Sequence, residues 1–227
     1  MNKIIEILKG IIIGIANIVP GVSGGTLAIV MGIYDKLINA VTELFKKPIE
    51  SIKSVWVYIL GIGIGVASSI IGVSYFIDAF PVPTTALFVG LIIGAIPLII
   101  SKVNSKKIGN VDIISFCLLM VSVLILPYIG TSSSSDQALN NNFIIMFGIG
   151  IIGAFTIVVP GVSGTMILMA LGYYESIMEM ASSFIKAIIS FDMSAIFSNG
   201  IALMPFGIGI IVGVILTAKL IKWLLQI

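Results

Sequence analysis

Long apolar stretches restrict the fold of this chain more than any other feature. Residues 54–77, 111–129 and 200–221 approach or exceed the roughly 20 residues that a helix needs to cross a bilayer. Charged residues make up only 10% of the chain, whereas ordinary soluble domains carry about 25%. The sequence therefore predicts an all-α polytopic membrane protein, with a single transmembrane domain over residues 1–227.

A motif that occurs twice divides this domain into two related parts. Val19 to Gly24 and Val159 to Gly164 are both Val-Pro-Gly-Val-Ser-Gly, at a spacing of 140 residues. At the same spacing, Tyr34-Asp35 aligns with Tyr174-Glu175. We expect a first repeat over about 4–77, connecting helices over about 85–129 and a second repeat over about 142–222.

The number of crossings predicts how the two repeats are oriented. Three spanning helices are expected between the motifs, over about 54–77, 85–101 and 111–129, and a fourth over about 200–221. Each motif lies in a helix-turn-helix hairpin, over about 4–38 and 142–180, that returns to the side it left. Because three is an odd number, the second repeat begins on the opposite side of the membrane from the first. The sequence therefore predicts an inverted repeat.

The lysines support this topology. With both termini in the cytoplasm, eleven of the twelve lysines fall inside and only Lys186 falls outside. The expected external loops, Asp78 to Thr85 and Thr131 to Asn142, carry no lysine. The bias of the chain towards Lys, Ile and Asn is typical of an AT-rich bacterial genome. The predicted location is a bacterial cell membrane, with the chain crossing it several times and with cytoplasmic N- and C-termini.

The depth of the turns is open between two interpretations. Each hairpin arm holds only about 15–18 residues before its turn, which is short for a spanning helix. The hairpins are either thin spanning pairs or re-entrant hairpins that stop part-way across. We favour re-entrant hairpins, whose irregular backbone must lie in protein or face a watery cavity.

The turn residues form the candidate binding site. Glycine, serine and threonine at a helix start offer free N–H groups and hydroxyls, which suit a phosphate or carboxylate, although small residues also serve simple helix packing. The glycine runs beginning at Gly61 and Gly207 are interpreted as helix packing. The predicted substrate-binding residues are Pro20, Gly21, Val22, Ser23, Gly24, Gly25, Thr26, Pro160, Gly161, Val162, Ser163, Gly164 and Thr165.

Three carboxylates are candidates for coupling transport to protons. Asp35 and Glu175 occupy equivalent positions after the two turns, each preceded by a tyrosine, and Glu6 lies in the first hairpin. Asp35 and Glu175 also fit helix caps at the membrane interface beside belt tyrosines, which we favour over a proton site.

The stretch from Gly14 to Thr26, followed by Gly32-Ile-Tyr-Asp-Lys-Leu37, resembles the signature of the PopT polyprenyl-phosphate transporters. The second copy, with Gly172-Tyr-Tyr-Glu175, resembles that family's second motif. The resemblance implies translocation of undecaprenyl phosphate from the outer to the inner leaflet, for reuse in cell-wall synthesis. It also implies that the turns hold the headgroup. Thr165 stands where the first copy has Gly25, so the two half-sites need not be equivalent.

Two other functions remain open. The same pocket would suit a transporter of a small soluble anion. A membrane polyprenyl-diphosphate phosphatase is disfavoured, because such enzymes carry Arg-Ser after the turn and this chain has neither arginine nor histidine. We expect no enzymatic activity, metal, cofactor or nucleic-acid partner. The expected partners are the polyprenyl-phosphate lipid and the bilayer, with a homodimer left open.

Overall fold

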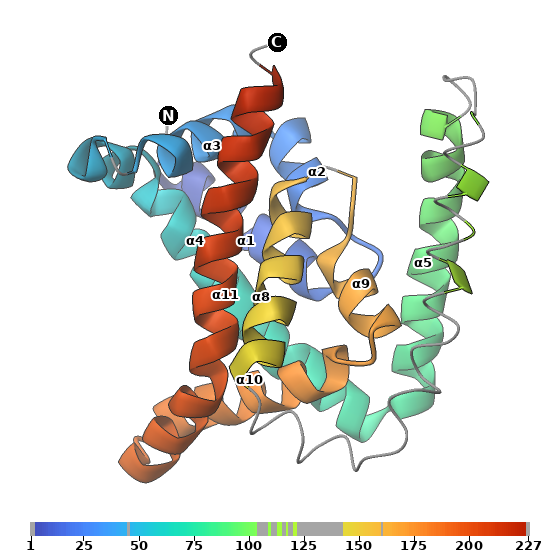
Figure 1. Cartoon of the computed structure of the whole chain (residues 1–227). Coiled ribbons are helices and arrows are strands. Elements are labelled where there is room, and N and C mark those ends of the chain that lie inside the picture. Colours follow the sequence, from blue (N-terminus) through green and yellow to red (C-terminus); the bar gives the residue numbers. More distant parts are fainter. Residues whose placement is uncertain are drawn as a thin grey trace.

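The computed structural model describes residues 3–44, 46–103, 109, 113–114, 117, 120–121, 143–159 and 161–225. Its secondary structure in those ranges is helical, without strands (Figure 1). The helices are α1 (Lys3–Ile18), α2 (Gly24–Val30), α3 (Tyr34–Glu43), α4 (Pro48–Ala79), α5 (Pro81–Val103), α8 (Phe143–Val158), α9 (Gly164–Ala170), α10 (Tyr174–Ile189) and α11 (Met193–Leu225). We call α1–α4 the first half and α8–α11 the second half.

Glycines bring the long helices of each half together. In the first half α1 packs on α4, and in the second α8 packs on α11. A methyl group on Gly61 would lie 3.0 Å from Gly10 Cα, and one on Gly209 would lie 3.0 Å from Gly150 Cα. Both helix pairs therefore depend on backbone contact that a side chain would prevent. The packing interpretation of the glycine runs is confirmed for Gly61 and Gly209.

A second turn divides the returning arm of each hairpin. Helices α2 and α9 have seven residues each, and α3 and α10 follow after short turns. Gly32 (φ +68°) and Gly172 (φ +78°) adopt the left-handed conformation in those turns, which glycine tolerates best. The expected simple hairpins over 4–38 and 142–180 are thus broken into three helices each.

The expected external loop from Asp78 to Thr85 is wrong. Helix α4 continues to Ala79, Phe80 forms the corner, and α5 begins at Pro81. Proline suits the first turn of a helix, where its missing N–H leaves no bond unmade. The Thr84 hydroxyl lies 2.8 Å from Phe76 O and 2.7 Å from Phe80 O, so it adds a second hydrogen bond to carbonyls that already accept backbone N–H groups at this corner.

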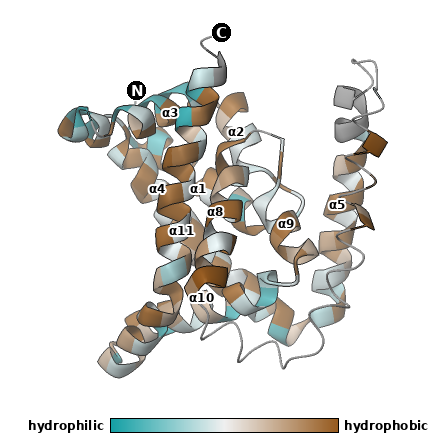
Figure 2. Ribbon diagram, in the orientation of Figure 1, coloured by the Kyte–Doolittle hydropathy of each residue, from teal (hydrophilic) through white to brown (hydrophobic). Residues whose placement is uncertain are grey.

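Two helices have the length and apolar composition to cross a membrane in the part of the chain described, namely α4 and α11. Segments of α5 and α8 are apolar but shorter. Helices α4 and α11 run in opposite directions, and hydrophilic residues gather around α3 and the nearby chain ends (Figures 1 and 2). The chain is a membrane protein. The predicted 111–129 helix and the loop from Thr131 to Asn142 lie largely or wholly outside the described residues.

Candidate functional site

The two Pro-Gly-Val-Ser-Gly turns contact each other directly. The Gly161 N–H of the second turn donates a 2.9 Å hydrogen bond to Thr26 Oγ1 at the start of α2. Gly21 (φ +83°) and Gly161 (φ +87°) adopt the same left-handed conformation in their turns. Segments 140 residues apart in sequence therefore form one structural unit, as the repeated motif led us to expect.

Buried hydroxyls of the second turn complete this contact. Ser163 Oγ donates to Val22 O at 3.2 Å, and Thr165 Oγ1 lies 3.4 Å from Val19 O. The two hydroxyls also lie 3.0 Å apart, and both residues are at least nine-tenths buried. These side chains hold the second turn against the backbone of the first.

The two turns differ in how they use their serines. Ser23 Oγ accepts a 3.3 Å hydrogen bond from Thr26 N and caps α2. Ser163 makes no such cap on α9, because its hydroxyl points to the opposite turn. The two turns therefore differ in their hydrogen bonds, although their motifs are identical in sequence.

The short helices limit the part played by helix dipoles. Because α2 and α9 have only seven residues each, few peptide dipoles add up at their N-termini. Individual backbone N–H groups at Gly24 and Gly25 and the hydroxyls nearby are the polar groups available to an anion.

A pair of tyrosines locks the two halves around the turns. Tyr34 Oη donates a 2.7 Å hydrogen bond to Val158 O, and Tyr174 Oη donates one of 3.0 Å to Ile18 O. Each acceptor is the last residue of the helix that leads into the opposite turn. The interpretation of Tyr174 as a belt tyrosine is wrong, because the residue is 3% exposed and points inward.

Asn17 is a polar residue of the site that the sequence analysis missed. Its carboxamide lies across Gly24 at the start of α2, where a methyl group would come within 2.6 Å of Asn17 Cγ. The position equivalent to Asn17 in the second half is Ile157. A lone amide in the apolar run before the first turn was the available signal.

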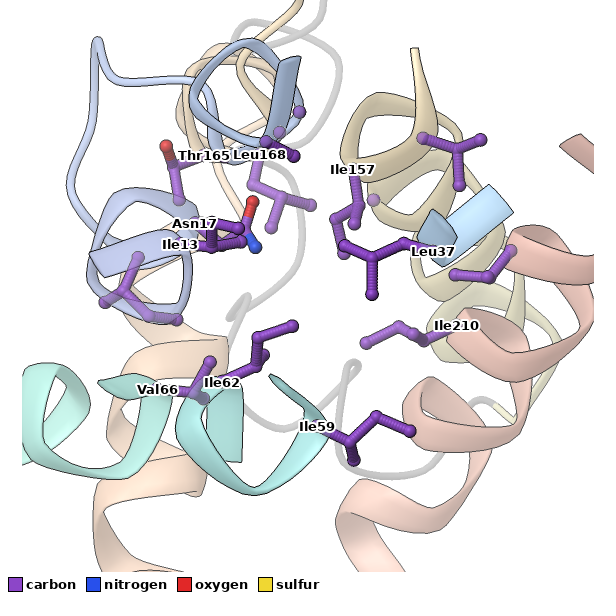
Figure 3. A pocket seen from close by; sticks show the side chains of 18 of the residues that line it. Ile13, Asn17, Leu37, Ile59, Ile62, Val66, Ile157, Thr165, Leu168 and Ile210 are labelled. Carbon is purple, nitrogen blue, oxygen red and sulfur yellow. The ribbon is translucent and has the colours of Figure 1, made fainter. Parts of the chain in front are cut away.

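The turns border a cavity of about 460 Å³ between the two halves (Figure 3). Gly24, Gly25, Gly164 and Thr165 form part of its wall, with Asn17, Tyr34 and Tyr174 close by in the lining. Most of the remaining wall is Ile, Val, Leu and Met, contributed by both halves. Among the residues that the structure describes, the lining includes no lysine or carboxylate.

The three candidate carboxylates have different surroundings. Asp35 and Glu175 lie exposed in the first turns of α3 and α10. Neither residue caps its helix, because the N-cap residues are Ile33 and Tyr173 and no side chain makes a cap hydrogen bond there. Glu6 instead has a side chain only 15% exposed, accepts a 3.0 Å hydrogen bond from Tyr58 Oη and lies 3.8 Å from Lys36 Nζ. Glu6 is therefore the one of the three that lies in a polar cluster. Within the described ranges, acidic and cysteine side chains form no group of three that could hold a metal ion.

The whole chain was compared with known protein families and with curated proteins. A family model described as undecaprenyl phosphate translocase-like matches residues 13–227. The chain belongs to this family. A polyprenyl-phosphate transporter of Vibrio cholerae is 25% identical over 100% of this chain and 71% of its own length. One of Staphylococcus aureus is 28% identical over 98% of this chain and 78% of its own length. No solved structure matches the chain.

In this translocase-like protein, the described residues of the two turns lie together where the first half contacts the second half. Gly21 also packs against α5, where a methyl group would lie 3.1 Å from the Ile92 nitrogen. Pro20 is fully buried, whereas Pro160 lies outside the described residues. The sequence thus located the centre of the candidate site, although it did not anticipate the tyrosine pair, Asn17 or the apolar cavity.

Proposed function

We propose that this chain translocates undecaprenyl phosphate across the bacterial membrane, from the outer to the inner leaflet, so that the carrier is reused in cell-wall synthesis. The observation that carries this proposal is the direct contact of the two turns beside a cavity. The names of both relatives, polyprenyl-phosphate transporter, support the same substrate.

The headgroup binds between the turns in this proposal. Thr26, Ser163 and Thr165 bond across the turns, so an arriving phosphate exchanges those neutral bonds for stronger, charge-assisted ones. The N–H groups of Gly24 and Gly25 add further donors. Breaking the contact between the turns as the phosphate binds gives the halves a means to move apart.

An inverted repeat with re-entrant hairpins provides the alternating access. The opposite directions of α4 and α11 support inversion, and the two short helices after the turns support hairpins that stop inside the membrane. The lysine distribution supports cytoplasmic N- and C-termini. We assign any proton coupling to Glu6 and not to Asp35 or Glu175. Glu6 is mostly buried and contacts Tyr58 and Lys36, whereas the other two carboxylates are exposed.

A leaflet assay tests the proposal. The full chain is reconstituted in sealed vesicles with a fluorescent polyprenyl phosphate, and an impermeant quencher reports which leaflet holds the label. Ser163→Val and Thr26→Val remove donors or acceptors between the turns, and we expect each to slow flipping about tenfold, the worth of a typical hydrogen bond. The control Thr85→Val removes a hydroxyl that bonds only within α5, to Pro81 O. No flipping by the unmodified chain overturns the proposal.

Two further readouts separate the other functions. Accumulation of labelled inorganic phosphate inside the vesicles, without lipid flipping, supports a soluble-anion transporter. Release of phosphate from polyprenyl diphosphate supports a phosphatase. We expect neither, because the cavity is mostly apolar and the described part of its lining offers no acidic residue to act as a general base.

A further inference from the structure

The cavity behind the turns has a composition that a phosphate alone does not explain. Its polar groups gather at the turns and Asn17, whereas isoleucine and valine form the wall further away, including Ile59, Ile62 and Ile210 (Figure 3). Transfer of a charged phosphate against such a wall is costly without partners. An apolar wall of this kind instead favours contact with hydrocarbon.

The two halves contribute equivalent positions to this wall. Ile13 faces it with Gly153, and Ala28 faces it with Leu168, each pair 140 residues apart. Gly153 is buried, yet a methyl group added there would meet no atom within 4 Å. The cavity is therefore lined by matching positions of the two halves, and its polar end lies at the turns.

We propose that this cavity holds the isoprenyl units next to the phosphate of the lipid, while the rest of the tail extends into the membrane. The proposal rests on the proposed function, because it assigns the phosphate to the turns. A cavity of about 150 Å³ holds one benzene ring, so about 460 Å³ accommodates roughly three five-carbon isoprene units. Chain length up to that limit then contributes to recognition.

Photocrosslinking of the full chain in lipid nanodiscs tests this assignment. The probe is a farnesyl phosphate analogue, which carries three isoprene units, with a photoreactive group on its first or its last unit. We expect crosslinks from the last unit at the cavity wall around Ile62 and Ile210. Crosslinks at outward-facing residues of the same helices, such as Ile64 and Ile211, would show that the tail stays in the bilayer.

Variants with larger side chains in the cavity give a second test that does not depend on the positions of the crosslinks. Gly153→Ile and Ala28→Leu introduce the side chains that the other half already carries at the equivalent positions, Ile13 and Leu168. We expect both variants to lose at least tenfold in wall crosslinking and in farnesyl phosphate affinity, with little change for the single-unit isopentenyl phosphate. The control Gly148→Ile lies on the same helix, and Gly148 is not among the residues that line the cavity. A methyl group added at Gly148 also meets no atom within 4 Å.

The outcomes separate this proposal from the proposed function. Tail crosslinks outside the cavity, or equal affinity in Gly153→Ile and Gly148→Ile, overturn the tail site while flipping by the unmodified chain persists. The tail site is supported if Gly153→Ile and Ala28→Leu bind farnesyl phosphate no more tightly than isopentenyl phosphate. Both variants must also unfold at a temperature like that of the Gly148→Ile control. If the unmodified chain does not flip the lipid at all, both proposals are overturned.

Discussion

Tyr34 and Tyr174 make the same hydrogen bond in opposite directions between the two halves. Each hydroxyl donates to the last residue of the helix that leads into the other half's turn, Val158 or Ile18, at 2.7 and 3.0 Å. The residues are separated by 140 positions, and so are their acceptors. The two hydrogen bonds therefore join the first half to the second half on either side of the contact between the turns.

Loss of either tyrosine hydroxyl should destabilise the contact between the halves. We expect Tyr174→Phe to cost about 1–3 kcal/mol, because Tyr174 is buried and Ile18 O loses the hydrogen bond from its hydroxyl. Tyr34→Phe should cost less, because Tyr34 is only half-buried. Thermal unfolding in detergent measures both. The control Tyr75→Phe alters an outward-facing residue that is 61% exposed and should leave the unfolding temperature unchanged.

Helix packing in both halves should fail when its contact glycines gain a side chain. We expect Gly61→Ala and Gly209→Ala each to cost about 1–3 kcal/mol, because the added methyl group meets backbone atoms that cannot move aside. Gly63→Ala is the matched control on the same helix as Gly61, with nothing within 4 Å. Alanine favours helix over glycine by about 1 kcal/mol, so Gly63→Ala should stabilise the chain. Equal unfolding temperatures for Gly61→Ala and Gly63→Ala would contradict the packing argument.

Local patterns predicted the membrane class, the repeat and the location of the turns. The apolar lengths and the identical motifs carry that information in contiguous residues. Gly32 and Gly172 occupy equivalent positions of the two repeats. Hydropathy alone predicts one continuous helix there, but the left-handed conformation of each glycine divides it into two. Similarly, the stretch from Asp78 to Thr85 was expected to be a loop, whereas Pro81 and Pro83 fit within the first turn of α5.

Contacts between the halves could not be predicted from local patterns. The partner of Tyr34 is 124 residues away, and that of Tyr174 is 156 residues away. The apolar cavity likewise depends on how two surfaces meet, since Ile62 and Ile210 look like ordinary lipid-facing residues in the sequence. Asn17 was overlooked because a single amide gives no pattern until the helix start at Gly24 is placed against it.

Neutralising Glu6 should affect proton-driven transport more than neutralising the exposed acids. We expect Glu6→Gln to abolish any stimulation of flipping by an imposed pH gradient, because it removes the charge that Tyr58 and Lys36 stabilise. Asp35→Asn and Glu175→Gln should retain the stimulation. Flipping is measured in vesicles with and without the gradient. Retained stimulation in Glu6→Gln would remove this residue as the coupling site.

Asn17 should favour the phosphate over an uncharged headgroup. Its carboxamide lies over Gly24 at the polar end of the cavity, where an N–H of the amide can donate to a phosphate oxygen. Asn17→Ile copies Ile157 of the second half, so the side chain suits this position and removes the donor.

We expect Asn17→Ile to weaken farnesyl phosphate binding about tenfold, equivalent to one hydrogen bond to a charged group, while farnesol binding stays the same or improves. Competition against the photoreactive analogue in nanodiscs measures both affinities. Asn39→Ile, on an exposed position of α3, is the control and should change neither. A uniform loss for phosphate and alcohol in Asn17→Ile would mean that Asn17 acts through packing on α2. A loss for the phosphate alone assigns the headgroup to the turn of the first half.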